Sequence, residues 1–403
     1  MATGRREGVG ICLSGGGYRA VLFHLGALRR LHELGILARP DLRVSSVSGG
    51  SFVAAVWAAA VARNPNWHAD WIRDVESPLR ALTRQDVRTR ALALRLLPWN
   101  WTRGHVSAES VAGRLHALAG VPLSDMPVSP EFRLCSTDLA FGANWEFRRD
   151  EMGDWLAGYV KTSPEWTLAR AAAASACFPP LFGPVPVRVP ASEFRRSGAK
   201  RSRPEQWQEA IGDLRLTDGG NYDNLGLEPV WKRVSWLLVS DAGGAYQFQS
   251  DRNFLWRLMR YAGTLESQCR SLRKRWLMSG YRTVFGGAYW SVRSATSRFP
   301  GVPADEVSPA EYSKAFAFDV VARIRTDLDA FSEGEAAVLM NHGYFTANRA
   351  VLAHAPELVA GTAPPLAAPE PGWAPPALVE EELRRRLAGS DRRRVFGRRA
   401  TSG

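Results

Sequence analysis

The sequence predicts an α/β fold, a three-layer α/β/α sandwich around a central, mostly parallel sheet. Three stretches carry this prediction, because in each an apolar or β-branched run leads directly into a glycine-containing turn. They cover residues 8–13, residues 44–47 and residues 214–218. Apolar residues at helical spacing follow the first two runs, which is typical of βα units whose strands lie parallel.

Length and composition describe a globular chain with a large core. The 403 residues are 45% hydrophobic and 23% charged, which excludes a disordered or fibrous protein. Four widely spaced cysteines without a CxxC pair favour a reduced compartment over a disulfide framework or a zinc site. No signal-peptide core follows the charged start, and no apolar run is long enough to span a bilayer. We therefore expect a cytoplasmic protein without a transmembrane helix.

Positive charge is concentrated at the C-terminal end. The net charge is +12, and residues 384–399 hold eight Arg and one acidic residue, Asp391. The remaining chain is only mildly basic, so no specific nucleic-acid partner is expected. Six prolines in residues 361–376 predict an extended linker, and the Arg-rich end behind it is predicted to be disordered. The sequence thus divides into a domain of residues 1–360 and a linker and tail of residues 361–403.

The first informative stretch is the glycine-rich turn of Gly15, Gly16 and Gly17 after the strand of residues 8–13. Leucines at helical spacing follow it up to Gly35. The spacing matches a dinucleotide fingerprint, but no acidic residue closes a second strand about 20 residues on. Consecutive glycines can also direct backbone N–H groups at an oxyanion, and we favour this interpretation over mere tight packing.

The second stretch places Ser48 between a β-branched run and an apolar segment, residues 52–62. The order strand, sharp turn, helix pushes the Ser Oγ out of the sheet and sets it at a helix N-terminus. A right-handed crossover of about one βαβ unit would bring this turn to the same sheet edge as the glycine turn.

The middle of the chain gives weaker signals. Residues 64–125 are expected to be mostly helical, and within them residues 85–97 form an amphipathic run that could lie on a membrane surface or on the body of the protein. Residues 132–139 read as a strand and residues 168–177 as an Ala-rich helix. The prolines that follow predict either the wall of an acyl pocket or a structural helix end.

The third informative stretch ends a strand at Asp218, followed by Gly219 and Gly220. Asp-Gly is also an ordinary turn, and Asp241, at the end of a strand over residues 234–240, is a rival carboxylate. Further on, the pattern predicts a long helix over residues 253–277, a last strand over 320–327 and a helix over 333–346.

A carboxylate is the better predicted partner of Ser48 than a histidine. The late histidines, His342 and His354, lie in a helical run and just before the linker rather than in a Gly/Asp-rich loop. A Ser–Asp dyad needs no His if Asp218 reaches the Ser48 Oγ and takes its proton.

Three motifs in order, SGGGYRA at residues 14–20, SVSGGS at 46–51 and DGGNYDNLG at 218–226, resemble the patatin-like phospholipase family. The segment ASACFPPLF at 174–182 is similar to a block of this family, and IRTDLD at 324–329 is similar to a segment of its bacterial members. The resemblance spans residues 8–350. It implies a patatin-like sandwich with Ser48 as nucleophile, Asp218 as base and Gly15, Gly16 and Gly17 as the oxyanion hole.

In this resemblance Arg19 would hold the glycine turn, and Gly50, Gly219 and Gly220 would support the two other motifs. Ser46 replaces the first Gly of GxSxG, and Ala20 replaces the last Gly of the first motif. Both replacements are small, so we expect the geometry to survive.

The resemblance implies a serine hydrolase of lipid esters, of phospholipase A or lysophospholipase type, with no metal or cofactor. Two alternatives remain: a non-catalytic lipid- or partner-binding module, and a thioesterase or general esterase with the same dyad. A fluorophosphonate probe separates enzyme from binding module, because only an activated Ser reacts. The Arg-rich tail predicts peripheral contact with an anionic membrane, or a solvated tail without a partner.

Overall fold

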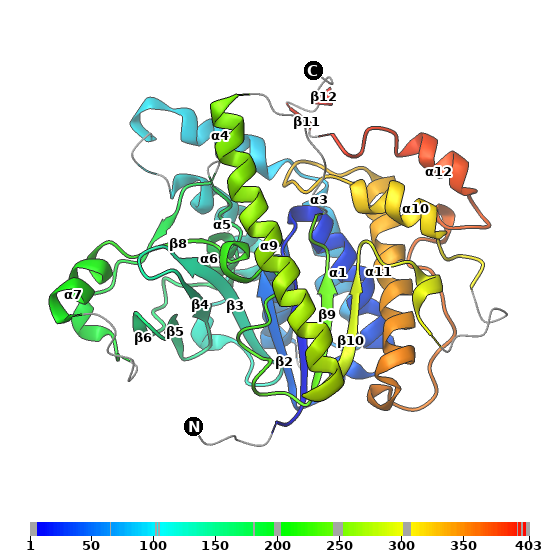
Figure 1. The fold of residues 1–403 in the computed structure, drawn as a ribbon, viewed down its shortest axis with the longest axis horizontal. Coiled ribbons are helices and arrows are strands. Elements are labelled where there is room, and N and C mark those ends of the chain that lie inside the picture. The colour runs from blue at the N-terminus through cyan, green and yellow to red at the C-terminus, as the bar shows by residue number, and fades with distance from the viewer. Residues whose placement is uncertain are drawn as a thin grey trace.

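The computed structural model describes residues 6–64, 66–100, 103, 105–179, 182–196, 203–244, 253–300, 308–392, 394–395 and 398–399. In these residues a ten-stranded sheet lies between two layers of helices (Figure 1). The predicted three-layer α/β/α sandwich is therefore confirmed.

Five neighbouring strands form the parallel centre of the sheet. In spatial order they are β10 (Gly286–Ser291), β9 (Trp236–Asp241), β1 (Val9–Leu13), β2 (Leu42–Val47) and β3 (Glu131–Asp138). Short antiparallel strands extend the sheet beyond β3: β4 (Ala143–Phe147), β5 (Glu151–Asp154) and β6 (Gly158–Lys161). The antiparallel part carries only weak sequence patterns, because its strands are four or five residues long.

A further strand, β8 (Arg215–Asp218), fills the place beside β3 beyond the end of β2. Val47, the last residue of β2, pairs with Cys135 of β3, and Asp218 pairs antiparallel with the next residue, Ser136. Since β4 occupies the other side of β3, β2 and β8 share one side and meet end to end. The short strand β7 (Val185–Pro186) pairs with β8.

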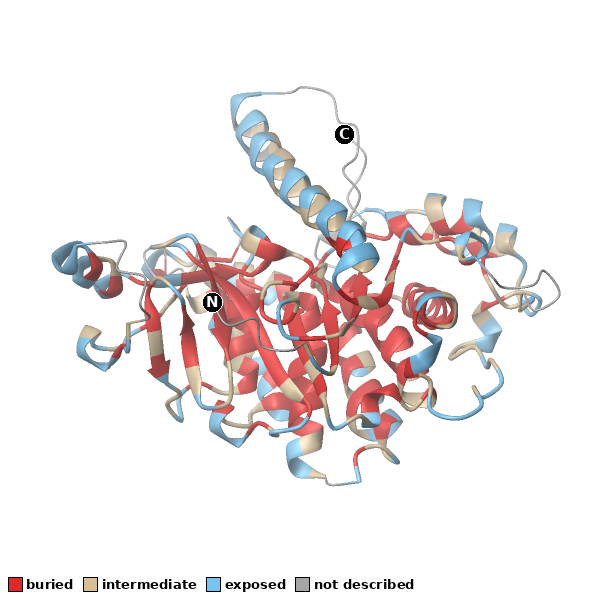
Figure 2. Cartoon of the chain, turned by 60° about the horizontal axis from the view of Figure 1, so that its bottom comes forward, coloured by how far each residue is buried: buried red, intermediate tan, exposed pale blue. Residues whose placement is uncertain are grey.

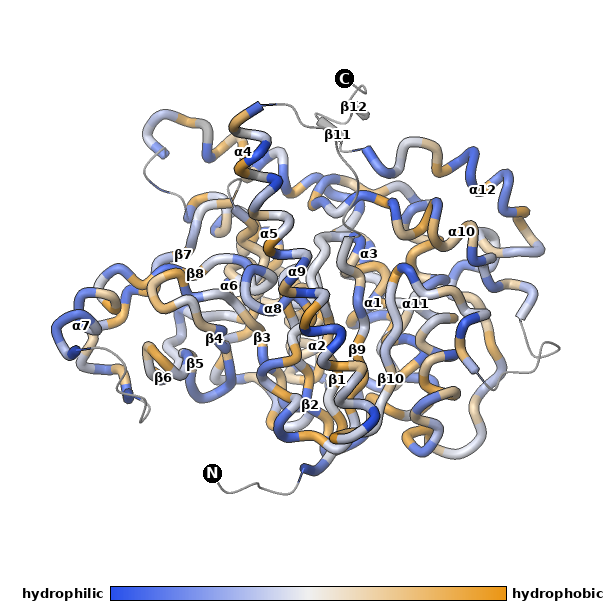
Figure 3. The backbone as a smooth tube through the Cα atoms, viewed as in Figure 1, coloured by the Kyte–Doolittle hydropathy of each residue, from blue (hydrophilic) through white to orange (hydrophobic). Residues whose placement is uncertain are grey.

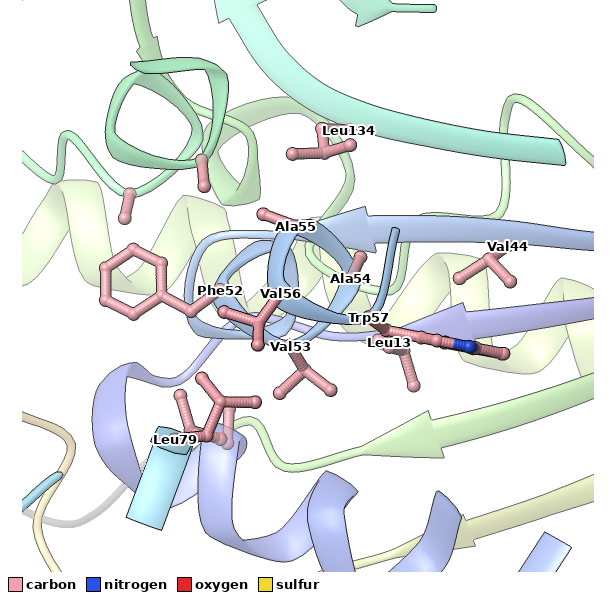
Figure 4. Packing of buried hydrophobic residues seen from close by; sticks show 14 of the residues in the cluster. Leu13, Val44, Phe52, Val53, Ala54, Ala55, Val56, Trp57, Leu79 and Leu134 are labelled. Atoms are coloured by element: carbon pink, nitrogen blue, oxygen red, sulfur yellow. The ribbon is translucent and has the colours of Figure 1, made fainter. Parts of the chain in front are cut away.

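The larger helical layer buries one face of the sheet. It contains α1 (Gly17–Glu33), α2 (Gly49–Arg63), α5 (Val106–Ala119), α6 (Leu168–Ser175) and α11 (Glu333–His354). Figure 4 shows apolar side chains around α2, among them Phe52, Val53 and Trp57. A helix that is apolar on all sides belongs in a core, which explains why α2 is buried from Gly49 to Ala60.

The opposite face packs on the 30-residue helix α9 (Phe254–Thr283) and on the loop after the short helix α8 (Gly220–Asp223). Strand β1 divides its side chains between the faces: Ile11 and Leu13 join the larger apolar cluster, and Cys12 joins the smaller one. This alternation is the pattern of a strand that is covered on both sides. None of the helices in the described part of the chain is long and apolar enough to cross a membrane.

The remaining elements lie around this framework. They are η1 (Ile36–Ala38), the π-helix η2 (Ile72–Glu76), α3 (Ser77–Thr83), α4 (Val87–Leu96), η3 (Pro98–Asn100), η4 (Leu123–Asp125), η5 (Ala191–Glu193), α7 (Pro204–Gly212), η6 (Thr296–Arg298), α10 (Lys314–Asp319), η8 (Val321–Arg323), η9 (Pro356–Leu358), η10 (Pro371–Trp373), α12 (Glu380–Arg386), β11 (Arg394–Val395) and β12 (Arg398–Arg399). The helical prediction for residues 64–125 holds for α3, α4 and α5.

The strand predicted for residues 320–327 is wrong. This segment is the turn η8 followed by a loop whose Ile324 carbonyl accepts a hydrogen bond from Arg19 Nη1 at 2.7 Å. The buried guanidinium of Arg325 pairs with Asp329 and Glu335, so side chains rather than a neighbouring strand fix the loop. The helix predicted for 333–346 is α11, which continues to His354.

The segment of residues 361–392 packs against the body, which differs from the linker that its prolines predict. Glu370 N–H donates to Asn341 Oδ1 at 2.9 Å, and Leu383 of α12 is fully buried. Burial of Ala374 and Leu387 continues the contact. Of the Arg-rich end after Leu387, residues 388–392, β11 and β12 are described, and the Ser390 carbonyl accepts the Arg325 N–H, which differs from the predicted disorder. Residues 393, 396–397 and 400–403 lie outside the described residues.

Candidate active site

Ser48 stands at the turn between β2 and α2 in a backbone conformation that L-residues avoid. Its φ is 52° and its ψ is −122°, and no other described non-glycine residue has a positive φ. Close approach explains the glycines that follow, because a Cβ atom on Gly49 would overlap the Gly17 carbonyl and one on Gly50 the Leu13 carbonyl. The turn is a sharp strand-to-helix elbow that exposes the Ser hydroxyl.

A buried chain of hydroxyl groups holds this elbow. Ser175 Oγ, in α6, accepts the Ser48 N–H at 2.8 Å and donates to the Cys135 carbonyl at 2.5 Å. Because the Ser175 hydroxyl donates its proton to the Cys135 carbonyl, Ser175 Oγ accepts the hydrogen bond from Ser51 Oγ, which lies 2.8 Å away. Ser46 Oγ lies 3.1 Å from Ser51 Oγ, so the residue that replaces the usual glycine joins the chain.

The glycine turn lies against the elbow at the N-terminus of α1. The Gly15 N–H donates to the Asn224 carbonyl at 3.1 Å. Among the described residues, the N–H groups of Gly16 and Gly17 have no hydrogen-bond acceptor. Their φ values of 145° and 56° require glycine, and a Cβ on Gly16 would lie 2.9 Å from the Ala242 carbonyl. Two free donors at a helix N-terminus suit an anion.

Arg19 fastens this turn to two loops. Its buried guanidinium donates to the Ala242 carbonyl from Nη2 at 2.8 Å and from Nε at 3.1 Å, and to the Ile324 carbonyl at 2.7 Å. The Arg19 pKa is lowered to about 10, mainly by burial and to a smaller extent by the nearby Arg270 charge. The side chain remains charged at neutral pH and sits behind the turn, since it does not line the cavity described below.

Asp218 ends β8 directly opposite the elbow. Its Oδ1 accepts the Gly220 N–H at 2.7 Å, and its buried Oδ2 has no well-formed hydrogen bond in the described residues. The Asp218 pKa is raised to about 7, mainly by burial and to a smaller extent by the Glu266 charge. The Gly220 N–H and the Ser48 hydroxyl act in the opposite direction, so the hydroxyl interacts with the carboxylate at a looser geometry.

Backbone contacts tie the Asp218 loop to the elbow. The Gly219 N–H donates to the Ser175 carbonyl at 3.1 Å, so Ser175 holds Ser48 through its side chain and Gly219 through its backbone. A Cβ on Gly219 would overlap the Cys135 carbonyl, and one on Gly220 would lie 2.9 Å from Asp218 Oδ1. Gly219 is therefore required by the close approach of the loop to the backbone of β3, whereas a Cβ at Gly220 would press on side-chain oxygens, including the carboxylate of Asp218.

Ser48, Asp218 and the glycine turn line one cavity of about 320 Å³. Its apolar wall consists of Ala176, Phe178, Phe182 and Leu328, and its polar wall includes Arg88, Asn224, Glu266 and Arg270. The two phenylalanines come from the segment after α6 that was predicted either as an acyl-pocket wall or as a helix end. The cavity brings together a serine hydroxyl, a carboxylate with a raised pKa and two N–H groups that have no acceptor among the described residues.

The rival residues lie elsewhere. Asp241 has both oxygens engaged, because Oδ1 accepts the Gly243 N–H at 2.8 Å and Oδ2 accepts the Tyr289 hydroxyl at 2.6 Å. All seven histidines are among the described residues, and none lines the cavity. His342 is buried in α11, where burial lowers its pKa to about 4, and His354 packs on Phe299.

Sequence reasoning missed the roles of Ser175 and Asn224. Ser175 lies in the motif at residues 174–182, but the pattern does not reveal that its hydroxyl reaches the Ser48 N–H across 127 residues. Asn224 belongs to the third motif, and its backbone carbonyl accepts the Gly15 N–H of the first motif. No group of three or more potential metal ligands occurs in the described part of the chain.

Comparison with solved structures gives distant similarities. Human GIVD cytosolic phospholipase A2 is 14% identical with a TM-score of 0.48, over 86% of this chain and 61% of that one. VipD from Legionella pneumophila is 16% identical with a TM-score of 0.36, over 87% of this chain and 67% of that one. The chain thus spans about three fifths of the human enzyme's length. No curated protein matches the chain.

A family model described as patatin-like phospholipase matches residues 11–231, more than half of the chain. The match includes the glycine turn, the Ser48 elbow and the Asp218 loop, the three segments that meet at the cavity. On this match the chain belongs to the patatin-like phospholipase family.

Proposed function

We propose that this protein is a serine lipid acyl hydrolase that uses Ser48 and Asp218 as a dyad. The proposal is supported by the end-to-end arrangement of β2 and β8, because Ser48 and the buried Asp218 carboxylate line the same cavity. In the described residues, Asp218 Oδ2 makes no well-formed hydrogen bond. Family membership supports lipid esters as the substrate class. A phospholipase A or lysophospholipase activity is the proposed form.

In the first step the Ser48 Oγ forms a bond to the ester carbonyl carbon, and its proton passes to Asp218 Oδ2. The raised pKa makes Asp218 a suitable base, since a pKa of about 7 balances the ionised fraction at neutral pH against basicity. The proton then moves to the leaving alcohol oxygen as the C–O bond breaks, which leaves an acyl-enzyme.

The developing oxyanion would be held by the N–H groups of Gly16 and Gly17. Gly15 is a weaker candidate than the sequence implies, because its N–H is already donated to the Asn224 carbonyl. The positive end of α1 adds to the stabilisation of negative charge. Arg19 acts through this turn as a positioning residue.

In the second step a water attacks the acyl carbon, Asp218 takes its proton and the Ser48–acyl bond breaks. The fatty acid leaves and the proton returns to Ser48 Oγ. The acyl chain would lie along Phe178 and Phe182, since they form the apolar wall of the cavity.

The test combines a fluorophosphonate probe with hydrolysis of a soluble short-chain ester. Ser48→Ala should abolish labelling, and Ser48→Ala and Asp218→Asn should each lower kcat/KM by about 10³-fold or more. Asp241→Asn is the matched carboxylate control and His342→Ala the histidine control, each with its melting temperature recorded. Equal labelling of wild type and Ser48→Ala, or a histidine variant as inactive as Ser48→Ala, would overturn the dyad.

Contact of the Arg-rich end with an anionic membrane is a separate proposal from the sequence. Arg384 lies 3.9 Å from an Asp319 oxygen, and Arg385 and Arg386 pair with Glu382. These carboxylates reduce the charge available to a membrane, so the proposal rests on the Arg residues after Asp391.

A further inference from the structure

The long helix α9 carries a row of exposed apolar side chains along its outer face. The row, called the outer stripe here, consists of Phe254, Leu258, Tyr261, Leu265 and Leu272, with exposed fractions from 48% to 74%. Steps of four, three, four and seven residues keep these positions on one face of a helix. Figure 2 shows this helix standing out from the body with much of its surface exposed.

Basic side chains border the outer stripe. Helix α9 has seven Lys and Arg residues and one acidic residue, Glu266. Arg270 and Arg273 turn toward the body, where Arg270 donates to the Gly244 carbonyl and Arg273 lies 3.5 Å from Asp223 and Glu228 oxygens. Arg275 and Arg282 are exposed and have no carboxylate partner in the described residues. Figure 3 shows hydrophilic and hydrophobic segments alternating along α9.

Positive charge continues beside this border into a surface hollow between α9 and β10. The hollow measures about 830 Å³, and its described lining contains Lys274, Arg282, Arg293 and Arg298 but no carboxylate. Lys274 lies over the Tyr289 ring at 4.2 Å. The side of the molecule next to the outer stripe is therefore a region of positive potential.

The inner face of α9 lines the candidate active site. Gly263, Glu266, Ser267 and Arg270 belong to the wall of the cavity that contains Ser48. A surface that binds the outer stripe therefore lies about one helix diameter, ~10 Å, from the cavity.

We propose that α9 docks this protein on an anionic phospholipid bilayer, with the outer stripe in the headgroup region and Arg275 and Arg282 against acidic headgroups. An amphipathic helix with one apolar face and basic flanks suits this position. A second copy of the chain fits less well, because the flanks would present like charges to each other without an acidic counterpart. The inference deepens the proposed function and rests on it for lipid as the substrate.

Binding is measured by co-sedimentation of the full chain with vesicles of phosphatidylcholine and phosphatidylserine. Leu258→Glu with Leu265→Glu should weaken binding by about tenfold or more, since each change removes apolar contact and adds repulsion. Arg275→Gln with Arg282→Gln should weaken binding to these vesicles but not to phosphatidylcholine alone, with a difference that disappears in high salt. Val128→Glu is the matched control, since Val128 is 75% exposed and precedes β3 at the sheet edge away from the cavity.

Wild-type binding by the Leu258 and Leu265 double variant would overturn the proposal. A change in its oligomeric state without a change in vesicle binding would assign the stripe to a second copy and also overturn it. Hydrolysis of a soluble ester should be the same in every α9 variant. If vesicle binding follows the prediction while wild type hydrolyses no ester, the proposed function fails and the docking surface stands.

Discussion

Ser175 hydrogen-bonds to both the Ser48 elbow and the Asp218 loop. Its hydroxyl accepts the Ser48 N–H, and its backbone carbonyl accepts the Gly219 N–H. Removing the hydroxyl leaves the Ser48 N–H without its partner next to a strained backbone, and a buried unpaired N–H costs about 1–3 kcal/mol. The elbow therefore depends on a residue that does not line the cavity.

We predict that Ser175→Ala lowers kcat on a soluble ester by about tenfold while KM changes little, because it displaces Ser48, the proposed nucleophile, without altering the cavity wall. Ser46→Gly is the matched control in the same hydroxyl chain. It removes only the outermost donor, so its kcat should stay within about threefold of wild type. Parallel steady-state kinetics decide this, and equal losses in both variants would contradict a specific role of Ser175.

The raised pKa of Asp218 predicts a pH profile. Since the base must be ionised, kcat/KM for an uncharged ester should rise with pH through a single titration near 7. A profile that is flat from about pH 5 to 9 would contradict Asp218 as the base.

The same group predicts the pH dependence of stability. Between its ordinary value of 3.8 and about 7, the folded chain holds a proton that the unfolded chain has lost. Raising the pH through this window therefore lowers the free energy of unfolding. Asp218→Asn should make this dependence less steep by the contribution of Asp218, while Asp138, whose pKa burial raises to about 8, continues to contribute. Urea unfolding of both proteins at several pH values measures the difference.

At the scale of elements, the site is made by three strand ends and the helices that follow them. The helices α1 and α2 both begin at the carboxyl edge of the parallel sheet, so Gly17 and Ser48 lie at adjacent helix N-termini. Asp218, the third part of the site, lies at the end of β8, which runs antiparallel to β3. The glycine turn fits between them because its residues lack Cβ atoms.

We predict that Gly16→Ala lowers kcat by about 10²-fold with little change in KM, since the new Cβ meets the Ala242 carbonyl and shifts the proposed oxyanion donors. Gly113→Ala, in α5, is the control: no atom lies within 4 Å of its new Cβ, and Ala favours the helix. Kinetics normalised to folded protein, measured by circular dichroism, separate loss of geometry from loss of fold. A loss of activity that only follows the loss of folded protein would assign the turn to packing.

At the scale of the whole molecule, the C-terminal segment completes the body. Leu383 and Leu387 of the α12 region are buried, and the Arg325 N–H donates to the Ser390 carbonyl at 2.9 Å. The Arg325 side chain pairs with Glu335 and fixes the loop whose Ile324 carbonyl accepts the Arg19 guanidinium. Because Arg19 holds the glycine turn, the C-terminal segment supports that turn indirectly. Residues 361–392 thus belong to the folded unit.

We predict that Leu383→Ala lowers the free energy of unfolding by about 2 kcal/mol or more, because it empties a buried site. Deleting residues 377–403 should destabilise the protein further, whereas deleting residues 393–403 should leave the melting temperature nearly unchanged. Thermal unfolding of the three proteins measures this. If both deletions melt like wild type, the packing of α12 does not stabilise the body.

The local units of the fold could be predicted from the sequence. The strand and glycine turn at residues 8–17, the elbow at Ser48 and the strand end at Asp218 follow from apolar runs, from glycines at close approaches and from the order of strand, turn and helix. These are properties of a few consecutive residues, so a pattern of residues is enough to predict them. The same reasoning predicted a sheet covered on both faces, since buried βα units require it.

The way in which these units meet could not be predicted from local patterns and is seen in the folded structure. No sequence pattern states that β8 pairs with β3 beyond the end of β2, that Ser175 reaches Ser48, or that the proline-containing segment after residue 361 covers the body. The wrong prediction of a strand at residues 320–327 has the same origin. An apolar run becomes a strand only if the edge of a neighbouring strand is free to pair with it, and here the Ile324 carbonyl accepts a hydrogen bond from Arg19 instead. Pairing and packing join residues that are distant in the sequence, such as Ser48 and Ser175, which are 127 positions apart. The free energies of these contacts outweigh the local preferences from which a sequence is interpreted.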